Sequence, residues 1–189
     1  DQESIQLYNL LYCQASVRLE HYSTVLSYTS ELLDSSENTL STRTEAGLLL
    51  CRADANQYVA SAEEAEKDFQ QALLFAKSKR DTDIHISALV KLGEFYAYQS
   101  SFFKAQKHLQ EAYKLSQSID NIDLQKSVDS ALGGFYAYRK DYEKSLSFYQ
   151  RAVEHNLALG YFQQASISLY NLGIISFRLS RSEDAIAFF

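Results

Sequence analysis

The stretch Leu-Gly-Glu-Phe-Tyr-Ala-Tyr at 92–98 returns almost unchanged forty residues later, as Leu-Gly-Gly-Phe-Tyr-Ala-Tyr at 132–138. Leu-Gly occurs again at 172–173, after another forty residues. Counting back by forty leads to two more small residues, Ala53 and Cys13. A fixed period of this length indicates a chain built from stacked copies of one small structural unit.

Further columns of residues keep the same register along the chain. They are Val25, Ala65, Ala105, Ser145 and Ala185; Thr29, Phe69, Leu109, Tyr149 and Phe189; and Leu32, Ala72, Ala112 and Ala152. Apolar positions within a unit step by three and four, which is typical of amphipathic helices. The small residues fall where two helices approach closely, and the large side chains fill the space around them. The sequence therefore predicts pairs of packed helices.

Short polar breaks separate the predicted helices. Those within a pair lie at 99–101, 139–141 and 180–182, and those between pairs lie at 80–82, 119–121 and 159–161. Ser, Asp, Asn and Thr in these breaks are expected to cap the helix that follows.

The composition agrees with nearly continuous helix. The 189 residues contain no proline and six glycines, where ordinary usage would give about nine and about thirteen. The formal charge of −6 argues against a nucleic-acid surface, so no nucleic acid is expected as a partner. No apolar run approaches the roughly 20 residues of a membrane span, so we expect no direct membrane insertion.

The repeat pattern closely resembles the tetratricopeptide repeat (TPR), although its period of 40 exceeds that family's usual 34. The resemblance implies an all-α, right-handed α-solenoid, or superhelix, of antiparallel helix pairs with about four and a half repeats. We expect one domain, 1–189, with units at 6–45, 46–85, 86–125 and 126–165 and a truncated unit at 166–189. The second unit departs from the pattern at Arg52 and Asn56, and the fourth has Asp129 where a large residue is expected.

Forty-residue repeats of this kind are similar to those of bacterial peptide-sensing regulators, MalT-type activators, kinesin light chains and sensor regions of diguanylate cyclases. The resemblance implies a binding module that holds a protein or peptide segment in its concave groove. We expect it to be the sensory or regulatory part of a larger bacterial signalling protein. A structural spacer, or a solenoid that self-associates through its uncapped C-terminal end, is the alternative. The missing initiator Met and a last unit that stops at Phe189 favour an excised module.

The groove is expected to be lined by the first helix of each unit. The resemblance places these side chains in it: Gln14, Arg18, Asp54, Tyr58, Glu94, Tyr98, Tyr138, Tyr170 and Arg178. Tyrosine recurs at one column, at 58, 98 and 138, and suits peptide recognition because a ring buries area while its hydroxyl orients the partner. The alternative is that these rings only pack against the turn between helices.

No catalytic constellation stands out in the sequence. It has no Gly-rich phosphate loop, nucleophile elbow or His-Glu-x-x-His motif, and its four histidines share no helix face. The acidic run 63–68 surrounds Ala65 and indicates a solvated helix face, without the spacing of a calcium loop. We therefore expect no enzymatic activity, no cofactor and no metal.

Two cysteines, Cys13 and Cys51, lie on the first helices of adjacent units. We expect small buried thiols. A disulfide is the alternative, and it would suggest an oxidising compartment. The sequence leaves the compartment open; it favours the cytoplasm, with a periplasmic sensor region as the alternative.

Overall fold

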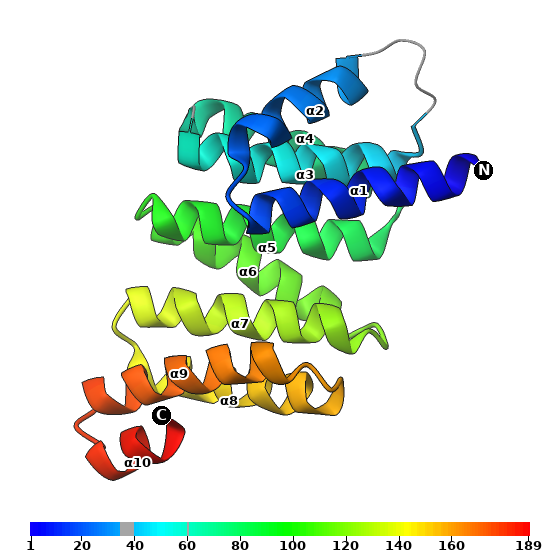
Figure 1. Ribbon diagram of the computed structural model, residues 1–189. Helices are drawn as coiled ribbons and strands as arrows, with labels where there is room; N and C mark the ends of the chain where they lie inside the picture. Colours follow the sequence, from blue (N-terminus) through cyan, green and yellow to red (C-terminus); the bar gives the residue numbers. More distant parts are fainter. Residues whose placement is uncertain (35–39, 60) are drawn as a thin grey trace. The chain divides into compact units, whose positions relative to one another are not determined.

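The computed structural model describes residues 1–34, 40–59 and 61–189, so small parts of the first two predicted units, at 35–39 and 60, lie outside it. The regular structure of the described residues is entirely helical (Figure 1). The helices are α1 (Gln2–Arg18), α2 (Tyr22–Asp34), α3 (Thr42–Val59), α4 (Ala62–Lys79), α5 (Thr82–Tyr98), α6 (Phe102–Ser116), α7 (Ile122–Tyr138), α8 (Tyr142–Ala158), α9 (Phe162–Arg178) and α10 (Ser182–Phe188). None of these helices combines the length and the apolar character needed to cross a membrane.

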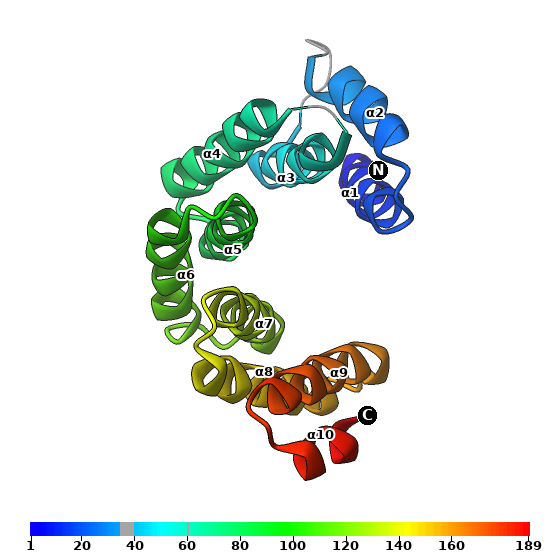
Figure 2. The ribbon, with the colours of Figure 1, turned by 90° about the vertical axis from the view of Figure 1, so that its left-hand side faces the viewer.

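The chain divides into two compact units, Asp1–Phe95 and Tyr96–Phe189. In the first unit α3 packs against α1, α2 and α4, and in the second α8 packs against α7 and α9. Within the first unit α1, α3 and α5 form one layer and α2 and α4 the other, and within the second α7 and α9 lie on one side of α6, α8 and α10 (Figure 2). The predicted helix pairs are confirmed.

The turn inside the last three pairs repeats with the same period of forty. Ser100, Lys140 and Ser180 adopt left-handed backbone conformations with φ of 57°, 60° and 60°. The next residue's N–H then bonds to a carbonyl five positions back, as from Asp141 to Tyr136 at 2.9 Å. This satisfies a carbonyl that the end of the helix leaves without a partner. The helix pairs begin at 42, 82, 122 and 162, four residues ahead of the predicted unit starts.

Among the predicted breaks, side-chain caps form at Asn121 and Asp81, between pairs, but not at Ser101 and Asp141, within pairs. Asn121 Oδ1 accepts from the Leu124 amide, and Asp81 Oδ1 accepts from the Ile84 amide, both at 3.2 Å. Ser101 and Asp141 make no side-chain cap, so the prediction is wrong there. The Asp141 carboxylate binds Lys144 Nζ instead, at 2.8 Å.

The core explains the column of small residues. A Cβ on Gly133 would lie 2.8 Å from the Tyr149 ring, and one on Gly173 would lie 2.7 Å from the Phe189 ring. Both glycines therefore make room for the aromatic residue sixteen positions later, as the repeat predicted.

Cys13 and Cys51 are free thiols in one buried cluster with Val25, Leu48 and Ala55. The hydrogen bond between the two thiols and their burial raise the pKa of Cys51. The interpretation as buried thiols is confirmed, and the structure contains no disulfide between them.

Candidate functional site

A pocket of about 550 Å³ opens in the second unit between α7 and α9. We call it the α7–α9 pocket. It is lined by Gly134, Ala137, Tyr138, Lys140, Tyr142, Tyr149, Ile174, Ile175 and Arg178. Small residues on α7 leave the space open, and aromatic and branched side chains wall it. Such a concave, mainly apolar site with a few polar groups is typical of ligand binding.

The two copies of the repeated stretch differ at one position, and that position lies in the α7–α9 pocket. Glu94 in the first copy is Gly134 in the second. A Cβ on Gly134 would meet the Tyr149 hydroxyl at an ordinary contact distance of 3.5 Å, so packing does not require glycine there, unlike at Gly133. The absence of a side chain at 134 keeps the pocket open.

The lining of the α7–α9 pocket carries positive charge only. Lys140 and Arg178 belong to it, and no carboxylate does. Carboxylates near these residues in the chain bind other cations: Asp141 pairs with Lys144, and Glu143 pairs with Arg181, both at 2.8 Å. The pocket therefore favours an anionic group at its rim.

The predicted groove residues of the first unit are partly engaged within the fold. Asp54 is buried and binds Lys91 Nζ at 2.8 Å. Partial burial lowers the pKa of Lys91, but the Asp54 and Glu94 carboxylates outweigh it and leave that pKa above its usual value. Glu94 itself is exposed on α5.

Other predicted residues of the first unit are exposed. Gln14 and Arg18 lie exposed on α1. The Tyr58 ring stacks on Tyr22, with centroids 4.9 Å apart, yet 61% of Tyr58 stays exposed. This stack at the start of α2 agrees with the alternative that the tyrosine packs near the turn, while the exposed part leaves surface for a partner.

In the second unit, the α7–α9 pocket brings together Tyr138 and Arg178 among the predicted residues. Tyr98 and Tyr170 are exposed outside its lining, and Tyr170 contacts the Phe189 ring at 5.7 Å. Sequence reasoning missed Lys140, Tyr142, Tyr149 and Ile175 as pocket residues. Tyr142 and Tyr149 lie on α8, a second helix, and Lys140 lies in the turn before it, whereas the prediction covered first helices only. Ile175 lies on a first helix, α9, but outside the columns that were expected to face the groove.

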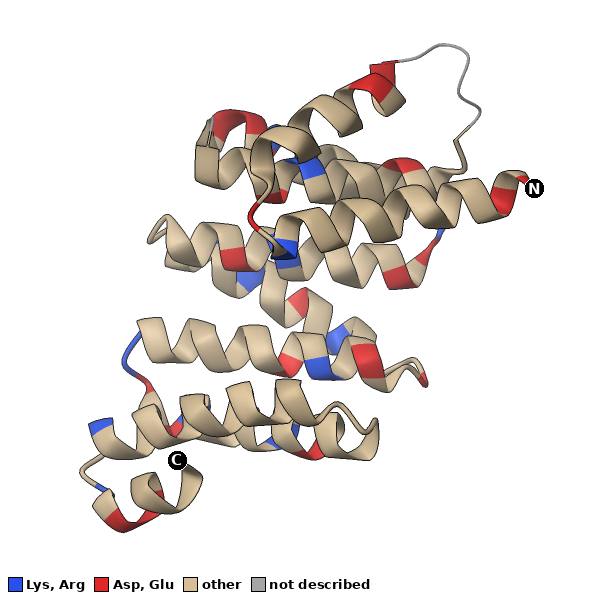
Figure 3. Ribbon diagram, in the orientation of Figure 1, with Lys and Arg blue, Asp and Glu red and all other residues tan. Residues whose placement is uncertain are grey.

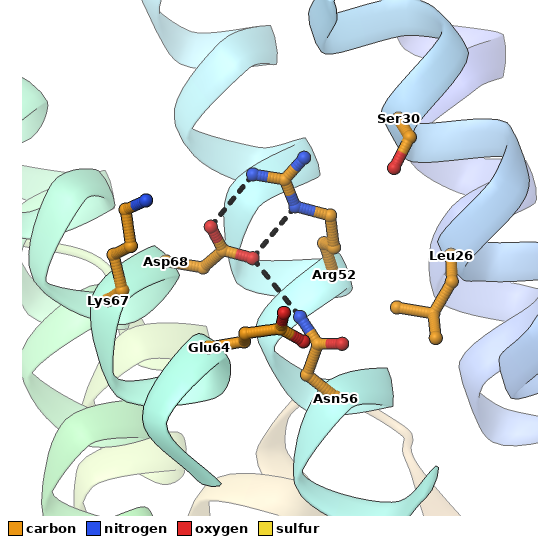
Figure 4. A pocket seen from close by; sticks show the side chains of 7 residues that line it. All are labelled: Leu26, Ser30, Arg52, Asn56, Glu64, Lys67 and Asp68. Carbon is orange, nitrogen blue, oxygen red and sulfur yellow. Dashed lines mark hydrogen bonds and ion pairs between the residues drawn. The ribbon is translucent and has the colours of Figure 1, made fainter. Parts of the chain in front are cut away.

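A buried ion pair links α3 to α4 in the first unit. Arg52 Nε and Nη2 donate to the two carboxylate oxygens of Asp68, each at 2.8 Å, and Asn56 Nδ2 adds a bond of 3.4 Å (Figure 4). The hydrogen bonds that Arg52 donates to Asp68 raise the pKa of Arg52. Asp68 is 4% exposed, so the expectation that the acidic run forms a solvated face is wrong at this position.

A second buried carboxylate, Asp129, lies between α7 and α8. It is 1% exposed, with Arg151 Nη2 at 3.3 Å and His155 Nδ1 at 3.5 Å, but neither of its oxygens accepts a hydrogen bond. Burial raises the pKa of Asp129 to about 6, and Arg151 offsets this only in part. Burial and the Arg151 charge lower the pKa of His155.

The described residues contain no group of three or more His, Cys, Asp or Glu side chains that could hold a metal ion. Acidic and basic residues are interspersed along the helices of each unit (Figure 3).

Solved structures with this fold define the class of protein. No protein-family model matches the sequence, and no curated protein matches it either. Bacillus thuringiensis PlcR, solved with the peptide PapR7 and DNA, superimposes with a TM-score of 0.80 at 13% identity, over 98% of this chain and 68% of PlcR. BtubC from P. vanneervenii superimposes with a TM-score of 0.73 at 17% sequence identity, over 93% of this chain and 73% of BtubC.

A third similar structure is a signal transduction ATPase (STAND) protein with a tetratricopeptide repeat sensor, from Pyrococcus horikoshii. It gives a TM-score of 0.72 at 17% identity, over 98% of this chain, which spans 29% of that protein. The chain is thus an α-solenoid of helix pairs. More specifically, its fold is that of the TPR-like repeat proteins.

Proposed function

We propose that this chain is a TPR-like module that binds a peptide or protein segment along α7 and α9, the first helices of two pairs in its second unit. The α7–α9 pocket takes an apolar side chain of that segment, and Lys140 and Arg178 bind a neighbouring carboxylate. The observation that carries the proposal is a pocket of about 550 Å³ with apolar walls and two cations without a carboxylate in its lining. Charge-assisted bonds of this kind are the stronger hydrogen bonds of an interface.

The similar structures support this choice. PlcR was solved with a bound peptide, and the STAND protein carries its repeats as a sensor. By analogy, the module serves as the sensory or regulatory part of a larger bacterial signalling protein. The proposal assigns it binding and no catalysis.

The test is a selection of random peptides on the whole chain, followed by titration calorimetry of the selected sequences. Selected peptides should place an aliphatic or aromatic residue next to Asp or Glu. Arg178→Glu should weaken the binding of these peptides by about tenfold or more, because it reverses a charge at the site. Gly134→Glu, which introduces the residue of α5, should block the pocket to a similar degree.

The matched control is Lys107→Glu, which makes the same charge change on an exposed lysine of α6 outside the pocket lining. It should leave affinity within about twofold. Equal losses for Lys107→Glu and Arg178→Glu would show that only the net charge of the chain matters, and would overturn the assignment of the pocket.

Self-association is the second candidate function, because α10 and the residue that follows it expose apolar side chains. Ile186 is 76% exposed and Phe189 is 68% exposed. If these side chains form an interface between copies, sedimentation velocity should show a dimer that Ile186→Asp abolishes. A wild-type chain that stays monomeric at high micromolar concentration would exclude this role.

A further inference from the structure

The α3–α4 pair lacks a ring stack that the next two pairs share. Tyr96 stacks on His108 with centroids 5.5 Å apart, and Tyr136 stacks on Phe148 at 5.6 Å. A lysine ammonium covers the tyrosine ring in each case, 4.6 Å away for Lys104 and 5.1 Å for Lys144. Forty residues before Tyr96, His108 and Lys104, the corresponding side chains are those of Asn56, Asp68 and Glu64.

The neighbouring core position departs from the repeat as well. Leu92, Leu132 and Leu172 form a buried column, and the residue at this position in α3 is Arg52. One polar cluster, Arg52, Asn56, Glu64 and Asp68, thus replaces a leucine, a ring stack and its covering lysine. These changes face one another across a single helix pair and remove ring volume from one place.

A pocket of about 370 Å³ lies at that place, and we call it the α2–α4 pocket. It is lined by Leu26 and Ser30 of α2, Arg52 and Asn56 of α3, and Glu64, Lys67 and Asp68 of α4. Asp68 lies on one side of the Arg52 guanidinium, and Leu26 and Ser30 of α2 lie on the other (Figure 4). Asp68 engages two of the three guanidinium nitrogens, and the third points away from it (Figure 4).

The bidentate ion pair fixes the guanidinium as a flat, cationic surface. Such a surface stacks on aromatic rings, and an arginine that is already held in place loses little rotamer entropy on doing so. The formal charges in the lining cancel, because Arg52 and Lys67 balance Glu64 and Asp68. A neutral ligand is therefore favoured over an ion. Ser30 and Asn56 offer a hydroxyl and an amide to a polar group on the ring.

We propose that the α2–α4 pocket binds an uncharged aromatic ring that carries a hydrogen-bonding group, of the phenol or indole type. The ring stacks on Arg52 in the place that the neighbouring pairs fill with their own side chains, and its polar group bonds to Ser30 or Asn56. The ring comes either from a tyrosine or tryptophan side chain of a partner segment or from a free small molecule. This site lies in the first unit and is independent of the α7–α9 pocket.

The test is a nuclear magnetic resonance titration of the ¹⁵N-labelled whole chain with p-cresol as the probe and toluene as its apolar counterpart. p-Cresol should cause saturable shifts at the Arg52 Nε–H and the Asn56 side-chain amide. Toluene should bind at least about fivefold more weakly, because a site built from polar groups rejects a ligand that leaves them unpaired.

Two variants close the pocket in different ways. The first variant combines Arg52→Leu, Asn56→Tyr and Asp68→Phe, which give α3–α4 the side chains that α7–α8 has at the corresponding positions. Because those side chains pack together in α7–α8, this variant should fold with the pocket filled and should bind p-cresol at least about tenfold more weakly. Ser30→Leu fills the pocket from α2, leaves the ion pair intact, and should have a similar effect. Arg178→Ala, in the other pocket, is the control and should not change the shifts at Arg52.

A comparison with acetyl-Gly-Tyr-Gly-amide separates the two sources of the ring. Binding as tight as that of p-cresol assigns the pocket to a partner's side chain, and binding of p-cresol alone assigns it to a free small molecule. Either result supports the ring site. The absence of saturable shifts at Arg52 and Asn56 in the wild-type chain, or undiminished binding to Ser30→Leu, overturns the proposal.

Discussion

Asp68 in the first unit and Asp129 in the second are both buried carboxylates with an arginine from the partner helix beside them. Asp68 accepts two hydrogen bonds from Arg52 at 2.8 Å and a third, longer one from Asn56. Asp129 lies 3.3 Å from Arg151, and neither of its oxygens accepts a hydrogen bond. The same pair of residue types is thus satisfied in one unit and unsatisfied in the other.

The difference follows from what else holds each arginine. Arg151 Nη1 donates to the Tyr113 hydroxyl at 2.8 Å, and its guanidinium lies 5.2 Å from the Tyr113 ring centroid and 5.8 Å from that of Phe148. These contacts hold Arg151 away from good geometry with Asp129. Because an unmet hydrogen bond costs a buried carboxylate more than a nearby charge returns, we expect Asp68 to stabilise its unit and Asp129 to destabilise its own.

Replacement of Asp68 tests the comparison most strongly. Asp68→Ala should lower the free energy of unfolding by about 3–5 kcal/mol, because it leaves the largely buried Arg52 without its counter-ion. Urea denaturation followed by circular dichroism measures this. The matched change at an exposed acidic residue, Glu63→Ala, should lower the free energy of unfolding by less than about 1 kcal/mol. A loss that small for Asp68→Ala would contradict the view that this ion pair holds α3 and α4 together.

Replacement of Asp129 should act in the opposite direction at neutral pH. Asp129→Leu gives α7 the residue that α5 has at Leu89, and should raise the free energy of unfolding at pH 7.5 by up to about 3 kcal/mol. The sign follows from the raised pKa of Asp129, about 6 in the folded chain against 3.8 ordinarily. The folded state holds a proton that the unfolded state releases, so the carboxyl destabilises the fold progressively as pH rises from about 4 to about 6. Denaturation of both chains at pH 4 and 7.5 should show the advantage of Asp129→Leu growing with pH.

His155 has the opposite dependence and supplies the control. The pKa of His155 is lowered in the folded chain, so the folded state favours the neutral imidazole. The stability that His155 contributes is therefore lost as pH falls below the ordinary pKa of about 6.5. The growth in advantage should therefore persist when Asp129→Leu is compared with wild type in a His155→Gln background. If the advantage is the same at both pH values in that background, Asp129 is not the titrating group.

The sequence predicted the helix pairs because they depend on a repeating pattern. The period of forty placed the turns at Ser100, Lys140 and Ser180, and it matched Gly133 with an aromatic residue sixteen positions later. These features depend on side-chain size and on local backbone preferences, and both can be inferred from the sequence around each position. The caps at Ser101 and Asp141 failed because nearby groups compete for the same side chains, as Lys144 does for Asp141.

The sites were harder to predict because they lie where the repeat is broken. Arg52, Asn56 and Asp129 were visible in the sequence as departures from the pattern, and a weak repeat was the natural interpretation. The structure shows that Arg52 and Asn56 meet Asp68 beside a pocket, while Asp129 lies buried without hydrogen bonds. Whether two residues that depart from the repeat meet depends on how their helices pack against each other. A single column of the repeat describes one helix position and therefore cannot predict such a contact.

The smallest effect we expect is the energetic coupling between Asp129 and Arg151. In a double-mutant cycle of Asp129→Ala and Arg151→Ala, the coupling energy should stay below about 1 kcal/mol, because the two groups share a charge contact and no hydrogen bond. The same cycle on Asp68 and Arg52 should give about 2–3 kcal/mol, because both bonds of a bidentate pair are lost. Urea denaturation of the wild type and the six variants at pH 7.5 supplies both values. Equal couplings would mean that Arg151 bonds to Asp129 in solution as Arg52 bonds to Asp68, and the contrast between the two carboxylates would then disappear.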